Sequence, residues 1–167
     1  NYTGLSDDDT AAVVAYLRSL PAVRNEIPES TFNIPLPEYP PATHAPSPSP
    51  SDTVAYGGYL VTIAHCFECH TPRNPDGSPD MARMGAGGNG FAGAPSGKTI
   101  YTANITSDPR TGLGNWTDEE IKTAITTGVR PGGGKLAPPM PYANFANMTD
   151  EDLDAVVLHA LAKPRDA

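Results

Sequence analysis

The chain has 167 residues, enough for one domain with an additional segment. Its 11 basic and 19 acidic residues give a net charge of -8, which argues against nucleic acid as a partner. The charge either favours a partner with a basic docking face or serves solubility alone. With 16 glycines, 19 prolines and only 7% aromatic residues, long loops are expected, and the core would be thin unless a large apolar cofactor fills it.

Residues 6–20 are predicted to form an amphipathic helix. Ser6 can cap it, three aspartates follow in its first turn, and Pro21 ends it. A matching pattern lies 143 residues later, where Thr149 takes the place of Ser6. A repeat at a domain-sized period indicates tandem copies, so we interpret residues 1–21 as the last helix of a truncated preceding domain of the same kind. A chance resemblance between two acidic-capped helices is the alternative.

Residues 22–50 are interpreted as a proline-rich linker. Nine prolines fall between positions 21 and 50, and the segment ends in the low-complexity run of residues 45–51. Such sequences favour extended polyproline-II backbone and act as semi-rigid spacers. His44 lies in this segment and is expected to be a solvated side chain.

Residues 51–167 are predicted to form the complete domain, and its first helix spans residues 52–64. Gly57 and Gly58 lie inside that helix, where each glycine costs about 1 kcal/mol relative to alanine. Such a cost indicates that another helix approaches closely, and the C-terminal helix is the natural candidate. The first helix is expected to run straight into the motif that follows it.

That motif is the run Cys66-Phe67-Glu68-Cys69-His70, a C-x-x-C-H sequence typical of c-type haem attachment. Two thiols about one helical turn apart can form thioethers with the two vinyl groups on one edge of a porphyrin. His70, next to the second thiol, is then placed to give the iron a nitrogen ligand.

Three other interpretations of this motif agree less well with the sequence. A tetrahedral zinc site needs four ligands, and the chain has no second cysteine pair. A thiol–disulfide motif would open a helix within a βαβ unit, whereas no strand pattern precedes this pair. A structural disulfide between cysteines three residues apart is rare. The motif therefore predicts haem c.

The remaining elements follow from local patterns. Residues 71–100 read as glycine-rich loop, and Thr117 with Glu120 forms a capping box that opens a helix ending at Gly128. Trp116, just before that helix, is expected in the core rather than in a catalytic role. The last helix is predicted over residues 149–161, stopped by Pro164.

A second axial ligand is expected in an electron-carrying haem domain, and methionine or histidine are the usual choices. Met140 is favoured because prolines flank it, and their fixed backbone could hold a thioether rigidly at the iron. The other candidates are less favoured: Met81, Met84, Met148, His65 and His159.

From about Ser51 onward the chain resembles a class I cytochrome c domain. It is most similar to the multi-haem cytochrome subunits of bacterial membrane-bound alcohol, aldehyde and gluconate dehydrogenases. The resemblance rests on residues 66–70, 104–108, 111–117 and 140–142. It implies iron ligation by His70 and Met140.

The resemblance also implies that the Asn-Ile-Thr and Trp regions line the haem. The predicted cofactor-binding residues are therefore Cys66, Cys69, His70, Met140, Asn104, Thr106, Trp116 and Tyr101. The family's three haem motifs are reduced here to one, so one haem per chain is predicted.

The expected fold is all-α: a cytochrome c fold of three to five helices around one covalent haem. The expected function is single-electron transfer between a periplasmic or membrane-bound dehydrogenase and the respiratory chain, with an oxidase or quinone-linked acceptor. Because covalent haem attachment implies export, a bacterial periplasmic location is predicted. A haem enzyme or sensor with an open sixth iron position is the alternative, and a tethered docking module of a larger dehydrogenase is a third reading.

Overall fold

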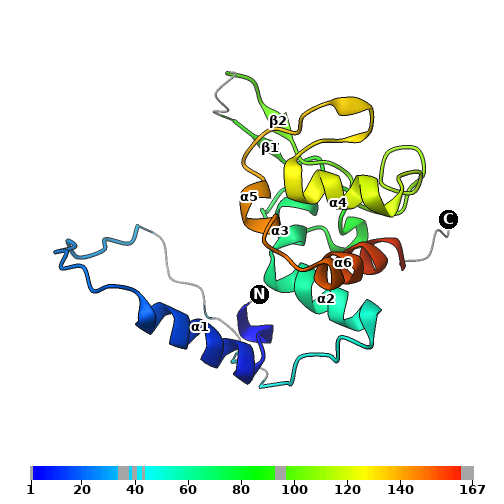
Figure 1. The fold of residues 1–167 in the computed structure, drawn as a ribbon. Coiled ribbons are helices and arrows are strands. Elements are labelled where there is room, and N and C mark those ends of the chain that lie inside the picture. The colour runs from blue at the N-terminus through cyan, green and yellow to red at the C-terminus, as the bar shows by residue number, and fades with distance from the viewer. Residues whose placement is uncertain (1, 34–37, 39–40, 43, 93–96, 163–167) are drawn as a thin grey trace. The chain divides into compact units, whose positions relative to one another are not determined.

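The structure is a computed structural model that describes residues 2–33, 38, 41–42, 44–92 and 97–162 (Figure 1). The chain divides into two compact units, residues 1–47 and 48–167. Pro35, Pro37 and Pro40 of the predicted linker, and Pro164 beyond the last helix, lie outside the described residues. The predicted boundaries at residues 21 and 50, and the nature of each segment, stay predictions.

The first unit contains a short 3-10 turn, Tyr2–Gly4, and helix α1, Asp7–Ser19. The predicted cap is present: the Ser6 hydroxyl accepts a hydrogen bond from the backbone N–H of Asp9 at 3.1 Å. Asp7, Asp8 and Asp9 occupy the first turn, where carboxylates interact favourably with the positive end of the helix dipole.

Helix α1 has an apolar stripe but buries none of its residues. Val13 is 49% exposed, Val14 41% and Leu17 58%. His44 was expected to be merely solvated; its side chain is exposed, but Nδ1 lies 2.9 Å from a carboxylate oxygen of Asp7. Among the described residues of this unit, helix α1 thus lacks a partner for its apolar face.

The second unit is mostly helical. Its α-helices are α2 (Thr53–Ile63), α3 (Cys66–His70), α4 (Asp118–Thr127), α5 (Tyr142–Phe145) and α6 (Asp150–Ala162). Short 3-10 turns at Met81–Arg83 and Pro131–Gly133 lie in the connecting loops.

A two-stranded antiparallel hairpin, β1 (Gly90–Phe91) with β2 (Ile100–Tyr101), interrupts the segment expected to be loop. The all-α expectation is corrected to this extent. The backbone groups of these residues pair as short strands, although the sequence there shows no alternation of apolar and polar residues that would predict a strand. The architecture is compatible with a cytochrome c fold.

The first helix does not continue into the cysteine motif, and that expectation was wrong. Helix α2 ends at Ile63, and His65 adopts a left-handed backbone with φ of 62°. A left-handed residue cannot extend an α-helix, so α3 begins afresh at Cys66 with its own direction.

Helices α2 and α6 cross at the glycine pair, as the sequence predicted. A Cβ built on Gly57 would overlap the carbonyl oxygen of Ala155 and lie 2.6 Å from its carbonyl carbon. Gly58 faces the ring of His159, whose Nδ1 is 3.1 Å from the carbonyl oxygen of Val54. The two glycines therefore allow backbone-to-backbone packing at the crossing.

Polar links brace the same helices. The Tyr56 hydroxyl donates to a carboxylate oxygen of Asp152 at 2.9 Å. Lys122 of α4 pairs with Asp154 of α6 and, at 3.3 Å, with Glu119 on its own helix. Helix α6 is thereby held from both α2 and α4.

The capping box that opens α4 is present as predicted. The Thr117 hydroxyl accepts from the backbone N–H of Glu120 at 3.2 Å, and the Glu120 carboxylate accepts from the backbone N–H of Thr117 at 2.9 Å. At the other end, Gly128 takes a left-handed φ of 70° and ends the helix.

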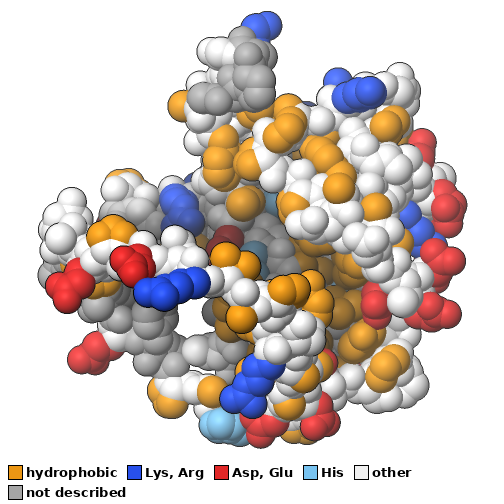
Figure 2. Space-filling view, turned by 60° about the vertical axis from the view of Figure 1, so that its left-hand side comes forward, with side chains coloured by type: hydrophobic (Ala, Val, Ile, Leu, Met, Phe, Trp, Pro, Cys, Tyr) orange, Lys and Arg blue, Asp and Glu red, His pale blue; other side chains and the backbone are white. Residues whose placement is uncertain are grey.

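The polypeptide supplies only a small apolar core. Among the described residues the buried apolar side chains are Val61, Ile121, Ala124, Leu153, Ala155 and Val157. On the face of the molecule that Figure 2 shows, apolar side chains are visible in several places. So few buried groups in a unit of this size match the expectation that a large apolar group completes the core.

Candidate haem site

The site begins with helix α3, which carries both cysteines and His70 on little more than one helical turn. Both cysteines are free thiols; Cys66 is half-buried and Cys69 is exposed. Burial raises the pKa of the Cys66 thiol to about 11. Two uncommitted thiols one turn apart, beside an imidazole, form the donor set that covalent haem attachment requires.

The His70 ring is held by a hydrogen bond to the backbone of a distant segment. Its Nδ1 lies 2.7 Å from the carbonyl oxygen of Ala103. Because a carbonyl only accepts, Nδ1 carries the proton and Nε2 keeps its lone pair. Burial lowers the pKa of His70, with the Ala103 hydrogen bond acting in the opposite direction. A neutral imidazole with Nε2 available is the form that ligates iron, so these residues fit haem.

A loop over residues 85–89 caps the C-terminal end of α3. The Gly87 N–H donates to the carbonyl oxygen of His70 at 2.7 Å. The Asn89 side-chain amide donates to the carbonyl oxygens of Cys69 at 2.8 Å and of Thr71 at 2.6 Å. The backbone of the haem motif is thus fixed from outside its own helix.

Asn104 and Thr106 belong to a hydrogen-bonded loop that follows Ala103. The Asn104 side-chain oxygen accepts from the backbone N–H of Thr106 at 2.9 Å and from its hydroxyl at 2.7 Å. The Asn104 amide donates to the Thr111 hydroxyl at 2.9 Å, and that hydroxyl donates to Asp108. The structure therefore joins Asn104 and Thr106 in one network; their contact with haem stays a prediction.

Trp116 and Tyr101 have different surroundings. Trp116 is half-buried and its backbone N–H donates to the carbonyl oxygen of Leu113 at 2.9 Å. Tyr101 lies on β2 and is 68% exposed. For both residues, a role in lining the haem remains a prediction from the resemblance.

Met140 lies in a braced turn between a cis Pro138–Pro139 peptide and helix α5. The Tyr142 hydroxyl donates to the carbonyl oxygen of Ala137 at 3.0 Å, which closes the turn around Met140. The Tyr142 ring packs on Gly128, where an added Cβ would lie 2.9 Å from the ring. Burial raises the pKa of Tyr142, so its hydroxyl stays a donor at neutral pH.

The competing ligand candidates are placed differently. Met81 is 65% exposed on its 3-10 turn, and His159 is engaged at the α2–α6 crossing. His65 occupies the left-handed break before α3, with Nδ1 3.2 Å from a carboxylate oxygen of Glu68. Met84 and Met148 are half-buried. Met140 is the methionine held in a braced turn flanked by prolines.

Sequence reasoning missed three residues of this site. Ala103 carried no signal, because its contribution is a backbone carbonyl 33 residues away from His70. Asn89 lies in a glycine-rich stretch whose pattern indicates only a loop, and the pattern around Tyr142 points to Met140 rather than to the tyrosine itself. Their roles depend on tertiary contacts.

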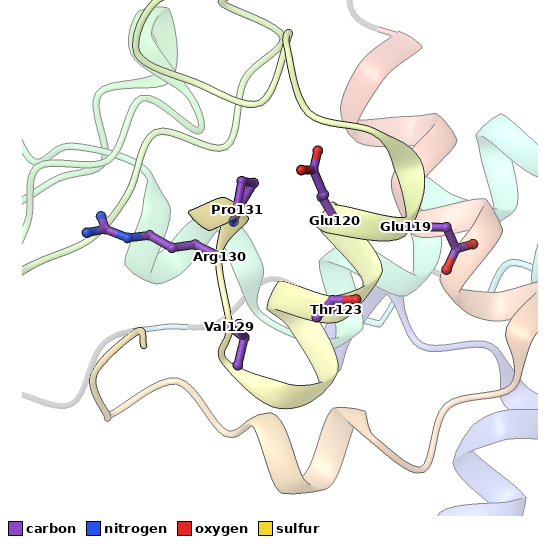
Figure 3. Close-up of a pocket in the computed structure, with 6 residues that line it drawn as sticks. All are labelled: Glu119, Glu120, Thr123, Val129, Arg130 and Pro131. Atoms are coloured by element: carbon purple, nitrogen blue, oxygen red, sulfur yellow. The ribbon is translucent and has the colours of Figure 1, made fainter. Parts of the chain in front are cut away.

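A small pocket lies elsewhere, between α4 and the loop after it. Figure 3 shows its lining residues, and the side chains of Glu119, Glu120 and Arg130 point away from one another. Glu120 is already engaged in the capping box. No charged cluster is directed into this pocket.

Among the residues that the structure describes, no group of three or more His, Cys, Asp or Glu side chains is arranged to hold a metal ion. No helix in the described part of the chain is long and apolar enough to cross a membrane.

A mostly helical unit with free Cys66 and Cys69 and a hydrogen-bonded His70 has the features of a c-type cytochrome domain. Comparison with known proteins agrees: the chain is homologous to cytochrome c subunits of alcohol, fructose and gluconate dehydrogenases. No family model matches the chain.

Three relatives illustrate the similarity. The chain is 39% identical over 100 residues to the cytochrome c subunit of a quinone alcohol dehydrogenase from Gluconobacter oxydans, covering 60% of this chain and 19% of that protein. It is 35% identical over 129 residues to the fructose dehydrogenase cytochrome subunit of Gluconobacter japonicus, covering 76% and 25%. For the gluconate 2-dehydrogenase cytochrome c subunit of Pantoea cypripedii the identity is 35% over 108 residues, covering 62% and 21%. The chain spans about a quarter or less of these relatives.

Proposed function

We propose that the second unit binds haem c covalently and carries single electrons. Cys66 and Cys69 would form the thioethers, and His70 and Met140 would be the axial ligands. The observation that carries the proposal is the hydrogen bond from His70 Nδ1 to the Ala103 carbonyl oxygen. This bond leaves the lone pair of Nε2 available to a metal ion, beside two free thiols. When bound, the haem iron supplies the one-electron couple.

The protein's own contribution is the rigidity of the two residues that would bind the iron. Ala103 fixes the His70 ring, and Tyr142 braces the turn that presents Met140. Ligands held this firmly on both sides would change little between oxidation states, which keeps the reorganisation accompanying electron transfer small. Thioether ligation and burial both raise the reduction potential, which favours a respiratory acceptor.

The proposed redox partners and cellular location rest on the names of the relatives, on the net charge and on covalent haem attachment. The relatives are cytochrome subunits of dehydrogenases, so we propose a dehydrogenase as donor and an oxidase or quinone-linked protein as acceptor. The net charge of -8 suits a partner with a basic docking face. We place the protein in the bacterial periplasm, because covalent haem attachment accompanies export.

The first unit suggests a tandem arrangement. Val14 of α1 corresponds in the repeat to Val157 of α6, and Ala12 corresponds to Ala155. Val157 and Ala155 are 0% and 1% exposed, whereas Val14 is 41% exposed. We propose that α1 is the last helix of a second cytochrome c-like unit, whose glycine-bearing helix would cover Ala12 as Gly57 of α2 covers Ala155.

The test of haem ligation is the absorption spectrum of the purified, matured protein, oxidised and reduced. We expect a low-spin c-type spectrum with the weak sulfur-to-iron charge-transfer band in the red. Met140→Ala should abolish that band, and Met81→Ala, at an exposed methionine, is the matched control. A high-spin spectrum that shifts with cyanide or carbon monoxide would favour an enzyme or sensor instead. Absence of haem from a correctly matured sample would refute the proposal.

A further inference from the structure

The short helix α3 depends on outside groups to hold its last residues. It has five residues, so its C-terminal carbonyls cannot find partners further along the same helix. The Asn89 side-chain amide bonds the carbonyl oxygens on both sides of His70, those of Cys69 at 2.8 Å and Thr71 at 2.6 Å. Asn89 therefore fixes the backbone from which the imidazole projects.

The backbone of Asn89 holds the other side of the same site. Its N–H donates to the Thr102 hydroxyl at 3.0 Å, and its carbonyl oxygen accepts from the Thr102 N–H at 3.0 Å. The Gly88 N–H donates to the Thr102 carbonyl oxygen at 2.9 Å. Thr102 is joined directly to Ala103, whose carbonyl oxygen accepts from His70 Nδ1.

The loop is packed tightly between these two segments. Gly87 has a φ of 72°, and an added Cβ there would lie 2.5 Å from the carbonyl carbon of Ala103. Its N–H also donates to the carbonyl oxygen of His70 at 2.7 Å. Gly87 is in close contact with Ala103 and hydrogen-bonded to His70. We therefore expect a shift of the neighbouring Asn89 to change the distance between His70 and Ala103.

We propose that Asn89 is a positioning residue that sets the strength of the His70–Ala103 hydrogen bond and through it the reduction potential. This inference rests on the proposed haem ligation by His70. A stronger N–H···O bond makes the imidazole a more electron-rich ligand, which stabilises the oxidised iron. Loosening the bond therefore favours the reduced form.

The experiment compares Asn89→Ala with the native protein by spectroelectrochemical titration of the matured cytochrome. We expect the potential to rise, so that the reduced fraction at a fixed applied potential increases severalfold while the spectrum stays low-spin. The paramagnetically shifted NMR signals of the His70 ring should move as well. Asn74→Ala is the control, because Asn74 bonds Ser78 within an exposed turn.

A second variant tests the same inference if Asn89→Ala fails to bind haem. Thr102→Val removes the hydroxyl that accepts from the Asn89 N–H and should shift the potential in the same direction. A lowered unfolding midpoint with unchanged potential and unchanged ring signals, in either variant that binds haem, would overturn the inference and leave the proposed function standing. Failure of the proposed function would already be visible in the native protein, as a spectrum without haem c.

Discussion

Replacing Gly57 with alanine would place a methyl group against the backbone of α6. The added carbon would overlap the Ala155 carbonyl oxygen and lie 2.9 Å from the Cβ of His159. The principal obstacle is main chain, which no side-chain rotation can relieve. Helices α2 and α6 would have to separate, and each contributes a buried valine to the core, Val61 and Val157.

The magnitude follows from two opposing effects. Overpacking a well-packed site costs roughly 1–3 kcal/mol, and contact with backbone argues for the upper end. Alanine is better than glycine inside a helix by about 1 kcal/mol. The expected net loss is about 2 kcal/mol, which lowers the midpoint of thermal unfolding by roughly 5–10 °C in a unit of this size.

Gly58→Ala is the matched comparison. Its added carbon would meet the ring of His159 at 2.8 Å, and that ring can move aside. The gain in helix propensity should then largely offset the contact. Circular dichroism and haem absorbance, followed together during thermal and denaturant unfolding, would measure both variants. A Gly57→Ala protein as stable as the native one would refute the close crossing.

Three further predictions concern stability. Val157→Ala should lower the free energy of unfolding by about 2 kcal/mol, because it removes buried apolar surface and leaves a cavity. Val14→Ala, at the equivalent but exposed position, should leave the unfolding midpoint unchanged. Equal effects of the two substitutions would contradict the difference in burial. Thr117→Ala should cost about 1 kcal/mol in denaturant unfolding, because it removes the capping box, and an unchanged midpoint would count against that box. Hydrogen bonds from Thr111 lower the pKa of Asp108 in the folded protein. The ionised carboxylate therefore stabilises the fold at pH values above the ordinary carboxyl pKa, and this stabilisation is lost as the pH falls through the lowered pKa. Asp108→Asn should therefore lower the unfolding midpoint at pH 7, and the difference should shrink as the pH falls below the ordinary carboxyl pKa. A pH-independent difference would refute this.

Local features of this protein could be predicted from sequence because their partners lie within one helical turn. Ser6 and Thr117 cap their helices through hydrogen bonds to residues three positions on. The attachment motif likewise places two thiols and an imidazole together without any distant residue. Even the crossing of α2 and α6 was indicated, because the costly Gly57–Gly58 pair needed a packing reason.

Tertiary structure alone decided the features that depend on distant segments. The left-handed backbone of His65 separates α2 from α3, although the sequence there reads as continuous helix. The acceptor for His70 is a carbonyl of Ala103, and any residue type has a carbonyl, so no sequence pattern could identify it. Asn89 joins α3 to the segment at Thr102 only because the intervening loop folds back. The sequence determined which groups could bind a haem, and the path of the loops determined how His70 is oriented to do so.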